Sequence, residues 1–227
     1  MDKGDILSTA LRRFAEHGYQ GTSMRDLATD LGVTPGAFYN HFPSKGEVLA
    51  SLIEDILTRD LDLFRTIDKT SGKNTLDGLI YAHVYSNCEG REEALVIRES
   101  HFLETPYQGR VRRMIQEYES IYSQAIAAEY TLDHEDLRQA TKALIGLGSS
   151  VIDWYRTDGP RSAHDVAKSY IGFCRGILAR AEADAAARPT RSRSELDRET
   201  AEEEFFRRIE HQINAVVRTR RTGPLVA

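Results

Sequence analysis

Apolar residues recur at spacings of three and four along most of the chain, which is the period of a helix with one buried face. The first such run covers 3–17, and a longer run covers 45–68. Later runs are separated by polar or glycine-containing breaks at 70–74 and 89–93. This pattern predicts an all-α fold. Further helices are expected over 76–87, 94–103, 106–130, 137–156 and 164–187.

Between the first two runs, residues 22–45 carry closely spaced signals for starting and stopping short helices. Ser23 is placed to cap a helix, with Asp26 three residues later to return the hydrogen bond. Gly32 supplies the left-handed backbone conformation that ends a helix, and Thr34 caps the next one. The signals predict two short helices joined by a tight glycine turn.

Two helices joined in this way have the geometry of a helix-turn-helix, whose second helix lies in the major groove of DNA. The small residues Gly36 and Ala37 allow the backbone to approach the duplex closely. Asn40 and Arg25 offer hydrogen bonds to base edges, and Lys45 stands beside a helix N-terminus that suits a phosphate. An ordinary helical hairpin within a bundle is the alternative.

The same stretch carries a family resemblance. Residues 36–45, GAFYNHFPSK, together with Gly18-Tyr19 and Gly32-Val33, resemble the N-terminal DNA-binding domain of TetR-type transcriptional repressors over residues 6–52. The resemblance implies base-edge or groove contacts from Arg25, Pro35, Ala37 and Asn40, and phosphate contacts from the other polar residues of the set. With Gly36 included, the predicted DNA-binding residues are Ser23, Arg25, Thr34, Pro35, Gly36, Ala37, Tyr39, Asn40, His41 and Lys45.

The resemblance also implies a domain organisation. A three-helix DNA-binding domain is expected over 1–46, a ligand-binding and dimerisation bundle over 47–187, and a linker with an extra amphipathic helix over 188–227. In the family, the last two bundle helices pair with their copies in a second subunit. Gly172 and Gly176 would allow such close packing, although packing within one chain is the alternative. A homodimer is favoured because one short reading helix contacts too few bases.

A weaker resemblance concerns the ligand. Residues 151–156, VIDWYR, and the helix that ends in 176–178 resemble TetR regulators that sense acyl-CoA thioesters in fatty-acid or sterol catabolism. Aromatic side chains would suit the acyl part, and arginines would meet the phosphates of coenzyme A. The predicted ligand-binding residues are Arg98, Phe102, Tyr118, Tyr122, Trp154, Tyr155 and Arg156. A multidrug or antibiotic sensor with an apolar pocket is the alternative, and each side chain has the plainer alternative of core packing or solvation.

Composition agrees with this interpretation. Hydrophobic residues make up 41% of the chain and charged residues 29%, as in globular proteins. The net charge of −5 disfavours non-specific coating of nucleic acid but permits a sequence reader with one basic surface. Cys88 and Cys174 form neither a metal pattern nor a disulfide framework, which suits a reducing cytoplasm. No apolar run approaches the ~20 residues of a membrane span, so no membrane partner is expected.

Other function classes find little support. An enzyme is not expected, because the chain lacks a phosphate loop, a nucleophile elbow, an HExxH motif and a dinucleotide fingerprint. No cofactor or metal is expected either, since His134 stands among acids without a second ligand at helical spacing. A non-DNA-binding adaptor that uses the C-terminal amphipathic helix remains as an alternative, but it would need a degraded helix-turn-helix, and residues 22–45 show no degradation.

Overall fold

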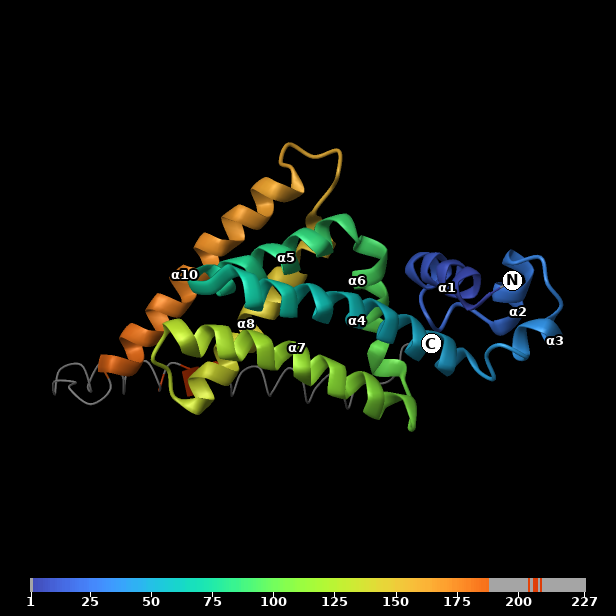
Figure 1. Cartoon of the computed structure of the whole chain (residues 1–227), viewed down its shortest axis with the longest axis horizontal. Coiled ribbons are helices and arrows are strands. Elements are labelled where there is room, and N and C mark those ends of the chain that lie inside the picture. The colour runs from blue at the N-terminus through green and yellow to red at the C-terminus, as the bar shows by residue number, and fades with distance from the viewer. Residues whose placement is uncertain (1, 188–203, 205, 208, 210–227) are drawn as a thin grey trace. The chain divides into compact units, whose positions relative to one another are not determined.

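The computed structural model describes residues 2–187 and positions 204, 206, 207 and 209, and every regular element among them is helical (Figure 1). The predicted all-α fold is therefore confirmed. The chain divides into two compact units, Met1–Glu182 and Ala183–Ala227. Most of the predicted C-terminal amphipathic helix lies outside the described residues. None of the described helices is long and apolar enough to cross a membrane.

Three short helices, which we call the head, open the first unit: α1 (Lys3–His17), α2 (Met24–Asp30) and α3 (Pro35–Tyr39). The predicted caps are confirmed. Ser23 Oγ and Thr34 Oγ1 each accept a hydrogen bond from the backbone N–H three residues later, at 3.2 and 3.3 Å. Gly18 and Gly32 occupy the turns with φ values of 71° and 68°, which L side chains rarely adopt.

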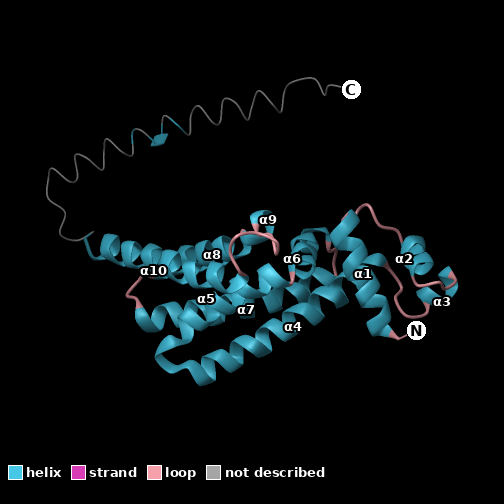
Figure 2. Cartoon of the chain, turned by 90° about the horizontal axis from the view of Figure 1, so that it is seen from above, coloured by secondary structure: helices cyan, strands magenta, loops and turns pink. Residues whose placement is uncertain are grey.

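The following elements form the body, and Figure 2 shows the head where α4 begins. They are α4 (Lys45–Ser71), η1 (Gly72–Asn74), α5 (Thr75–Glu89), α6 (Arg91–Arg98), η2 (Glu99–Phe102), α7 (Tyr107–Glu129), α8 (His134–Ser149), α9 (Val151–Trp154) and α10 (Ala163–Ala187), η denoting a 3-10 helix.

Several predicted boundaries are wrong by a few residues. The single helix expected over 137–156 is divided into α8 and α9 at Ser150, whose hydroxyl donates to the Leu147 carbonyl at 2.6 Å. The break expected over 89–93 is confined to Gly90, because its carbonyl already accepts the Ala94 N–H that starts α6, at 3.1 Å. The loop expected over 70–74 is mostly the end of α4 and η1.

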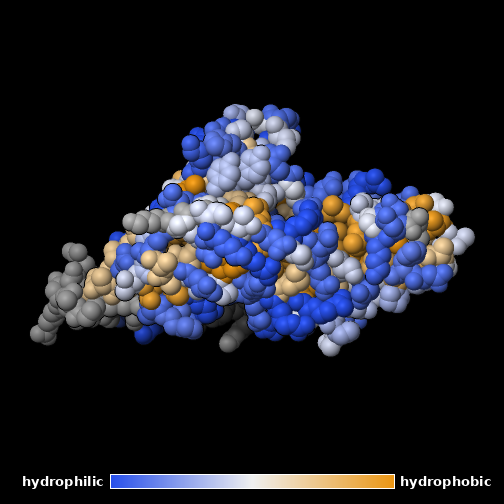
Figure 3. Space-filling view, viewed as in Figure 1, coloured by the Kyte–Doolittle hydropathy of each residue, from blue (hydrophilic) through white to orange (hydrophobic). Residues whose placement is uncertain are grey.

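Two apolar clusters form the core of the first unit. The head cluster joins Phe14, Leu27 and Phe38 to the first half of α4, and it includes Val96 and Val111 from the body. The body cluster joins the second half of α4 to α5, α7, α8 and α10. On the face drawn in Figure 3, charged and polar side chains cover most of the surface, with apolar patches between them.

His83 of α5 lies inside the body cluster. Burial lowers its pKa to about 4, so the ring is neutral at neutral pH. Its Nε2 donates to the Ile145 carbonyl at 3.1 Å, which leaves Nδ1 to accept from the Tyr118 hydroxyl. The ring fits because Gly148 has no side chain, since a Cβ there would lie 2.3 Å from His83 Cδ2.

We expect Gly148→Ala to lower the free energy of unfolding by about 1–3 kcal/mol, because the new methyl group would displace a buried His83 ring that is hydrogen-bonded at both nitrogens. Gly109→Ala is the matched control, since its Cβ would meet only the Arg113 guanidinium, at 3.8 Å. That change should raise stability by about 0.5–1 kcal/mol. Urea unfolding measures both, and a Gly148→Ala protein as stable as the parent would contradict this packing.

Candidate nucleic-acid interface and effector cavity

The second helix of the helix-turn-helix, α3, is oriented by two buried aromatic rings. Phe38 and Phe42 face the head core with ring centroids 6.5 Å apart. Because these rings point inward, Tyr39 and Asn40 point outward, and the Tyr39 side chain is 50% exposed. The sequence therefore places polar groups on the open side of α3, as a DNA-reading helix requires.

The predicted DNA-binding residues lie between Ser23 and Lys45, from the start of α2 to the first residue of α4. The exposed ones are Ser23, Arg25, Thr34, Pro35, Gly36, Tyr39 and Asn40, whereas Ala37, His41 and Lys45 are half-buried. The backbone around Gly36 is open, since a Cβ built there would meet nothing within 4 Å. Arg25 forms no ion pair with any residue that the structure describes, so its guanidinium is available to a ligand.

Two of these side chains also have structural roles, of which the cap at Ser23 is predicted from the sequence and the contacts of Lys45 are not. Ser23 is engaged in capping, since it also donates to Asp26 Oδ2 at 2.7 Å and thereby lowers the pKa of that carboxyl. Lys45 Nζ donates to the carbonyls of Tyr19 and Thr22 at 2.7 and 2.8 Å. Partial burial lowers the pKa of Lys45. Because Nζ also lies 4.1 Å from the centroid of the Tyr19 ring, Lys45 fixes the turn between α1 and α2.

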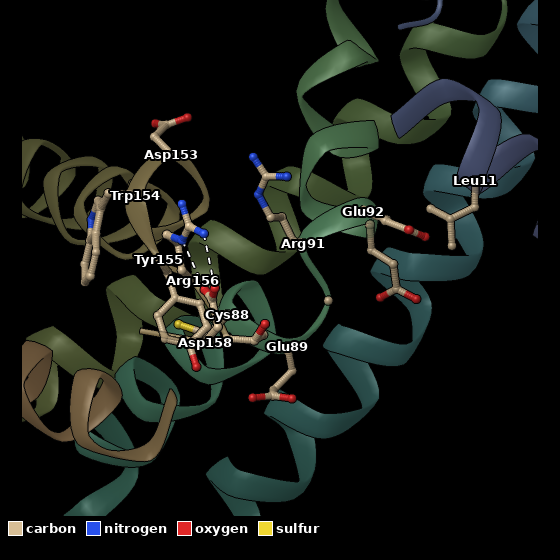
Figure 4. A pocket seen from close by; sticks show the side chains of 13 residues that line it. Leu11, Cys88, Glu89, Arg91, Glu92, Asp153, Trp154, Tyr155, Arg156 and Asp158 are labelled. Atoms are coloured by element: carbon tan, nitrogen blue, oxygen red, sulfur yellow. Dashed lines mark hydrogen bonds and ion pairs between the residues drawn. The ribbon is translucent and has the colours of Figure 1, made fainter. Parts of the chain in front are cut away.

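A second candidate site is an open cavity of about 830 Å³ in the body next to the head (Figure 4). Its walls come from α1, the junction of α5 and α6, and α9 with the loop that follows. The lining residues are Leu11, Cys88, Glu89, Gly90, Arg91, Glu92, Glu93, Asp153, Trp154, Tyr155, Arg156, Thr157 and Asp158. This volume is within the usual range for small-molecule sites.

Most of the charged groups in the cavity walls are paired. Glu93 meets Arg59 of α4 at 2.9 Å, Asp153 meets Arg98 at 2.7 Å, and Arg156 meets Asp158 at 3.1 Å. Among the residues that the structure describes, Arg91 bonds through its Nε alone, which donates to the Ile152 carbonyl at 3.1 Å. Its terminal nitrogens therefore remain for a ligand.

The structure divides the predicted ligand-binding residues among three places. Trp154, Tyr155 and Arg156 line the cavity, whereas Arg98 does not line it but pairs with the lining residue Asp153. Tyr118 and Tyr122 are buried in the body cluster, where the Tyr122 hydroxyl donates to the Leu79 carbonyl at 2.9 Å.

Phe102 lies neither in the cavity wall nor in the body cluster. Its ring stacks on Tyr19 of the head. Arg91 and Glu92 line the cavity but are not among the residues predicted from the sequence. The sequence predicts the charged run at 89–93 only as a break, because the contact of this run with α9 joins residues about sixty positions apart.

Comparison with known proteins gives matches over both parts. The family model described as bacterial regulatory proteins, tetR family, matches residues 6–52, and the model described as tetracyclin repressor-like, C-terminal domain, matches residues 69–178. The HTH-type transcriptional repressor KstR2 of Mycobacterium tuberculosis is 26% identical over 183 residues, which cover 77% of this chain and 91% of that protein.

Solved structures give the same fold. A tetR-family regulatory protein from Rhodococcus RHA1 has a TM-score of 0.70 at 20% identity, over 78% of this chain and 96% of that one. AibR, solved with isovaleryl coenzyme A and operator DNA, has a TM-score of 0.65 at 20% identity, over 75% of this chain and 96% of that one. Together with the helix-turn-helix geometry of α2 and α3, these matches establish that the chain belongs to the TetR family of bacterial transcriptional regulators.

Proposed function

We propose that this protein is a transcriptional repressor that binds a palindromic operator as a homodimer and releases it when a small molecule binds the body. The observation that carries this proposal is the head, in which Phe38 and Phe42 hold α3 so that Tyr39, Asn40 and the open backbone at Gly36 face outward. Family membership supports the repressor assignment, since KstR2 is a repressor by name.

An apolar surface on α10 supports the homodimer. Phe173 is 58% exposed and Ile177 is 40% exposed, and a Cβ at Gly172 or Gly176 would meet nothing within 4 Å. Exposed aromatic and aliphatic side chains on one helix are costly in water unless a partner covers them. A second copy of the chain would supply the same surface about a two-fold axis and would bring two heads to one operator.

We place the effector in the 830 Å³ cavity and infer that it is an acyl-CoA thioester. The free terminal nitrogens of Arg91 suit a phosphate of coenzyme A. The ring of Trp154, which is 52% exposed, can stack on the adenine base of the coenzyme. AibR was solved with a coenzyme A thioester, so the fold accommodates this class of ligand. An apolar organic cation, as in multidrug sensing, is the second candidate, because Glu89 and Glu92 form no ion pair with any described residue.

The effector class is tested by gel-shift binding of the purified protein to the DNA upstream of its own gene, with and without short- and long-chain acyl-CoAs. We expect release by an acyl-CoA but not by the free acid or by coenzyme A alone, because neither fragment makes both the acyl and the phosphate contacts. Release only by apolar cations such as quaternary ammonium dyes would replace the thioester assignment. Failure of the protein to bind any upstream DNA would contradict the repressor assignment.

Two head variants distinguish phosphate contacts from base contacts. Tyr39→Phe removes a hydrogen bond to a charged phosphate and should weaken operator binding about ten-fold or more, equally for all sequences. Arg25→Ala removes a base contact and should cost about 1–3 kcal/mol, mainly for the operator, so that specificity falls.

Exposed residues of the same types on the body provide the controls for these variants. Tyr85→Phe and Arg65→Ala should leave DNA binding unchanged, because both side chains belong to α4 or α5 and lie outside the predicted DNA-binding set. Fluorescence anisotropy with operator and scrambled duplexes measures all four variants. Operator binding that is unaffected by both head variants would contradict the assigned roles.

The homodimer is tested by placing a charge on the exposed α10 surface. Phe173→Asp should shift the protein to monomers in sedimentation and weaken operator binding, because the charge would be buried between subunits. Leu63→Asp on α4 is the matched control, since Leu63 is 42% exposed and should remain in solvent. A dimer that withstands Phe173→Asp would place the interface elsewhere.

A further inference from the structure

The turn between α1 and α2 is held by a segment of the body that lies far away in the sequence. Glu99 of η2 accepts a hydrogen bond from the Tyr19 N–H at 3.2 Å, across 80 residues of chain. Phe102, at the other end of η2, stacks on the Tyr19 ring with centroids 5.8 Å apart and planes 22° apart. One residue of the head is thus bound through both its backbone and its side chain.

Tyr19 is also held by residues of α1 and α4. Lys45 Nζ lies 4.1 Å from the centroid of the Tyr19 ring and donates to the Tyr19 carbonyl at 2.7 Å, while Phe14 meets the ring edge-on at 5.6 Å. Tyr19 therefore connects α1, the first residue of α4 and η2. Its pKa is raised, first by burial and then by the charge of Glu104.

We propose that this contact, the η2 clasp (Glu99 and Phe102 on Tyr19), is the positioning device that fixes the orientation of the DNA-binding head on the body. The inference rests on the proposed repressor function for its biological meaning, but not for its test. The head is also joined to the body by the covalent passage into α4, by the apolar packing of the head cluster, and by polar contacts at the start of α4, where Lys45 bonds to the Tyr19 and Thr22 carbonyls and the Ser44 and Tyr107 hydroxyls lie 3.1 Å apart. Those polar contacts lie at the junction with α4 itself, whereas the clasp holds the head from a second element. Apolar packing is non-directional, whereas a stacked ring and a backbone hydrogen bond define an orientation.

The position of the clasp on the chain connects it to the cavity. Helix α6 carries the cavity-lining residues Arg91, Glu92 and Glu93 at its start and leads directly into η2 at its end. It is also bonded to the α9 region at both ends, by Arg91 to the Ile152 carbonyl at 3.1 Å and by Arg98 to Asp153 at 2.7 Å. A ligand that displaces α9 therefore acts on the element that holds Tyr19.

A fixed orientation matters because two heads must match half-sites that lie about one helical turn apart, ~34–36 Å. A head that turns about its junction with α4 would adopt many orientations, of which few fit both half-sites. Binding to DNA would restrict such a head to those few orientations and would cost conformational entropy. A head that is already held in one orientation loses less entropy on binding.

The test measures the distance between head and body in the full-length chain. Nitroxide labels are placed on Arg12→Cys in α1 and Gln116→Cys in α7, both exposed positions. The native thiol Cys174 is buried, whereas Cys88 lines the cavity and is replaced by serine in all labelled proteins. Burial raises the pKa of the Cys174 thiol to about 11, so it competes little for the label. Dilution into excess unlabelled protein restricts the dipolar signal to distances within one chain.

The clasp predicts one narrow distance distribution in the parent, and a broader or displaced one in Phe102→Leu and in Glu99→Ala. Phe102→Tyr keeps the stacked ring and Glu99→Gln keeps an acceptor oxygen, so these two variants should restore the narrow distribution. The unfolding midpoint of each variant is measured alongside, and a midpoint equal to that of the parent excludes loss of stability as the cause of a broadened distribution.

Operator affinity provides the second measurement, and we expect it to fall about three- to ten-fold in Phe102→Leu and to recover in Phe102→Tyr. Distance distributions in Phe102→Leu and Glu99→Ala that match the parent would overturn the clasp, whatever the protein binds. If the distributions follow the clasp but the parent binds no operator, the proposed repressor function fails and the clasp stands.

Discussion

The structure depends on one long helix that contributes to two apolar cores. The first half of α4 places Val48, Leu49 and Ile53 in the head cluster, and its second half places Leu61 and Phe64 in the body cluster. Because interiors are close-packed, neither cluster can shift along α4 without opening voids. The packing of the head is therefore coupled to that of the body through α4. Val96 and Val111 of the body complete the apolar core against which α3 packs.

Local signals in the sequence predicted the head well. The caps at Ser23 and Thr34 and the glycine turns at Gly18 and Gly32 depend on residues a few positions apart, so the sequence alone was enough to place them. The same reasoning could not detect that Lys45 bonds to Tyr19 and Thr22, because that contact spans more than twenty residues. The lysine was predicted as a phosphate ligand, and its structural role became visible only in three dimensions.

The cavity was predicted less well, for a physical reason. Aromatic side chains suit both a ligand pocket and a core, and periodicity cannot distinguish the two uses. Tyr118 and Tyr122 are core residues that surround the neutral His83, whereas Trp154 and Tyr155 line the cavity. Phe102 has a third use, as the ring that stacks on Tyr19. Whether an aromatic residue packs in the core, lines the cavity or stacks on the head depends on how α5, α6 and α9 meet. The contacts between these helices join residues as far apart as Arg91 and Ile152.

The central claim is that two copies of the α3 surface read a single operator. Footprinting of the protein on the DNA upstream of its own gene tests it most directly. We expect a two-fold symmetric site with two protected major-groove segments whose centres lie about one helical turn apart, roughly 34–36 Å. A single unpaired footprint, or protection that spreads without a defined sequence, would contradict a dimeric operator-binding repressor.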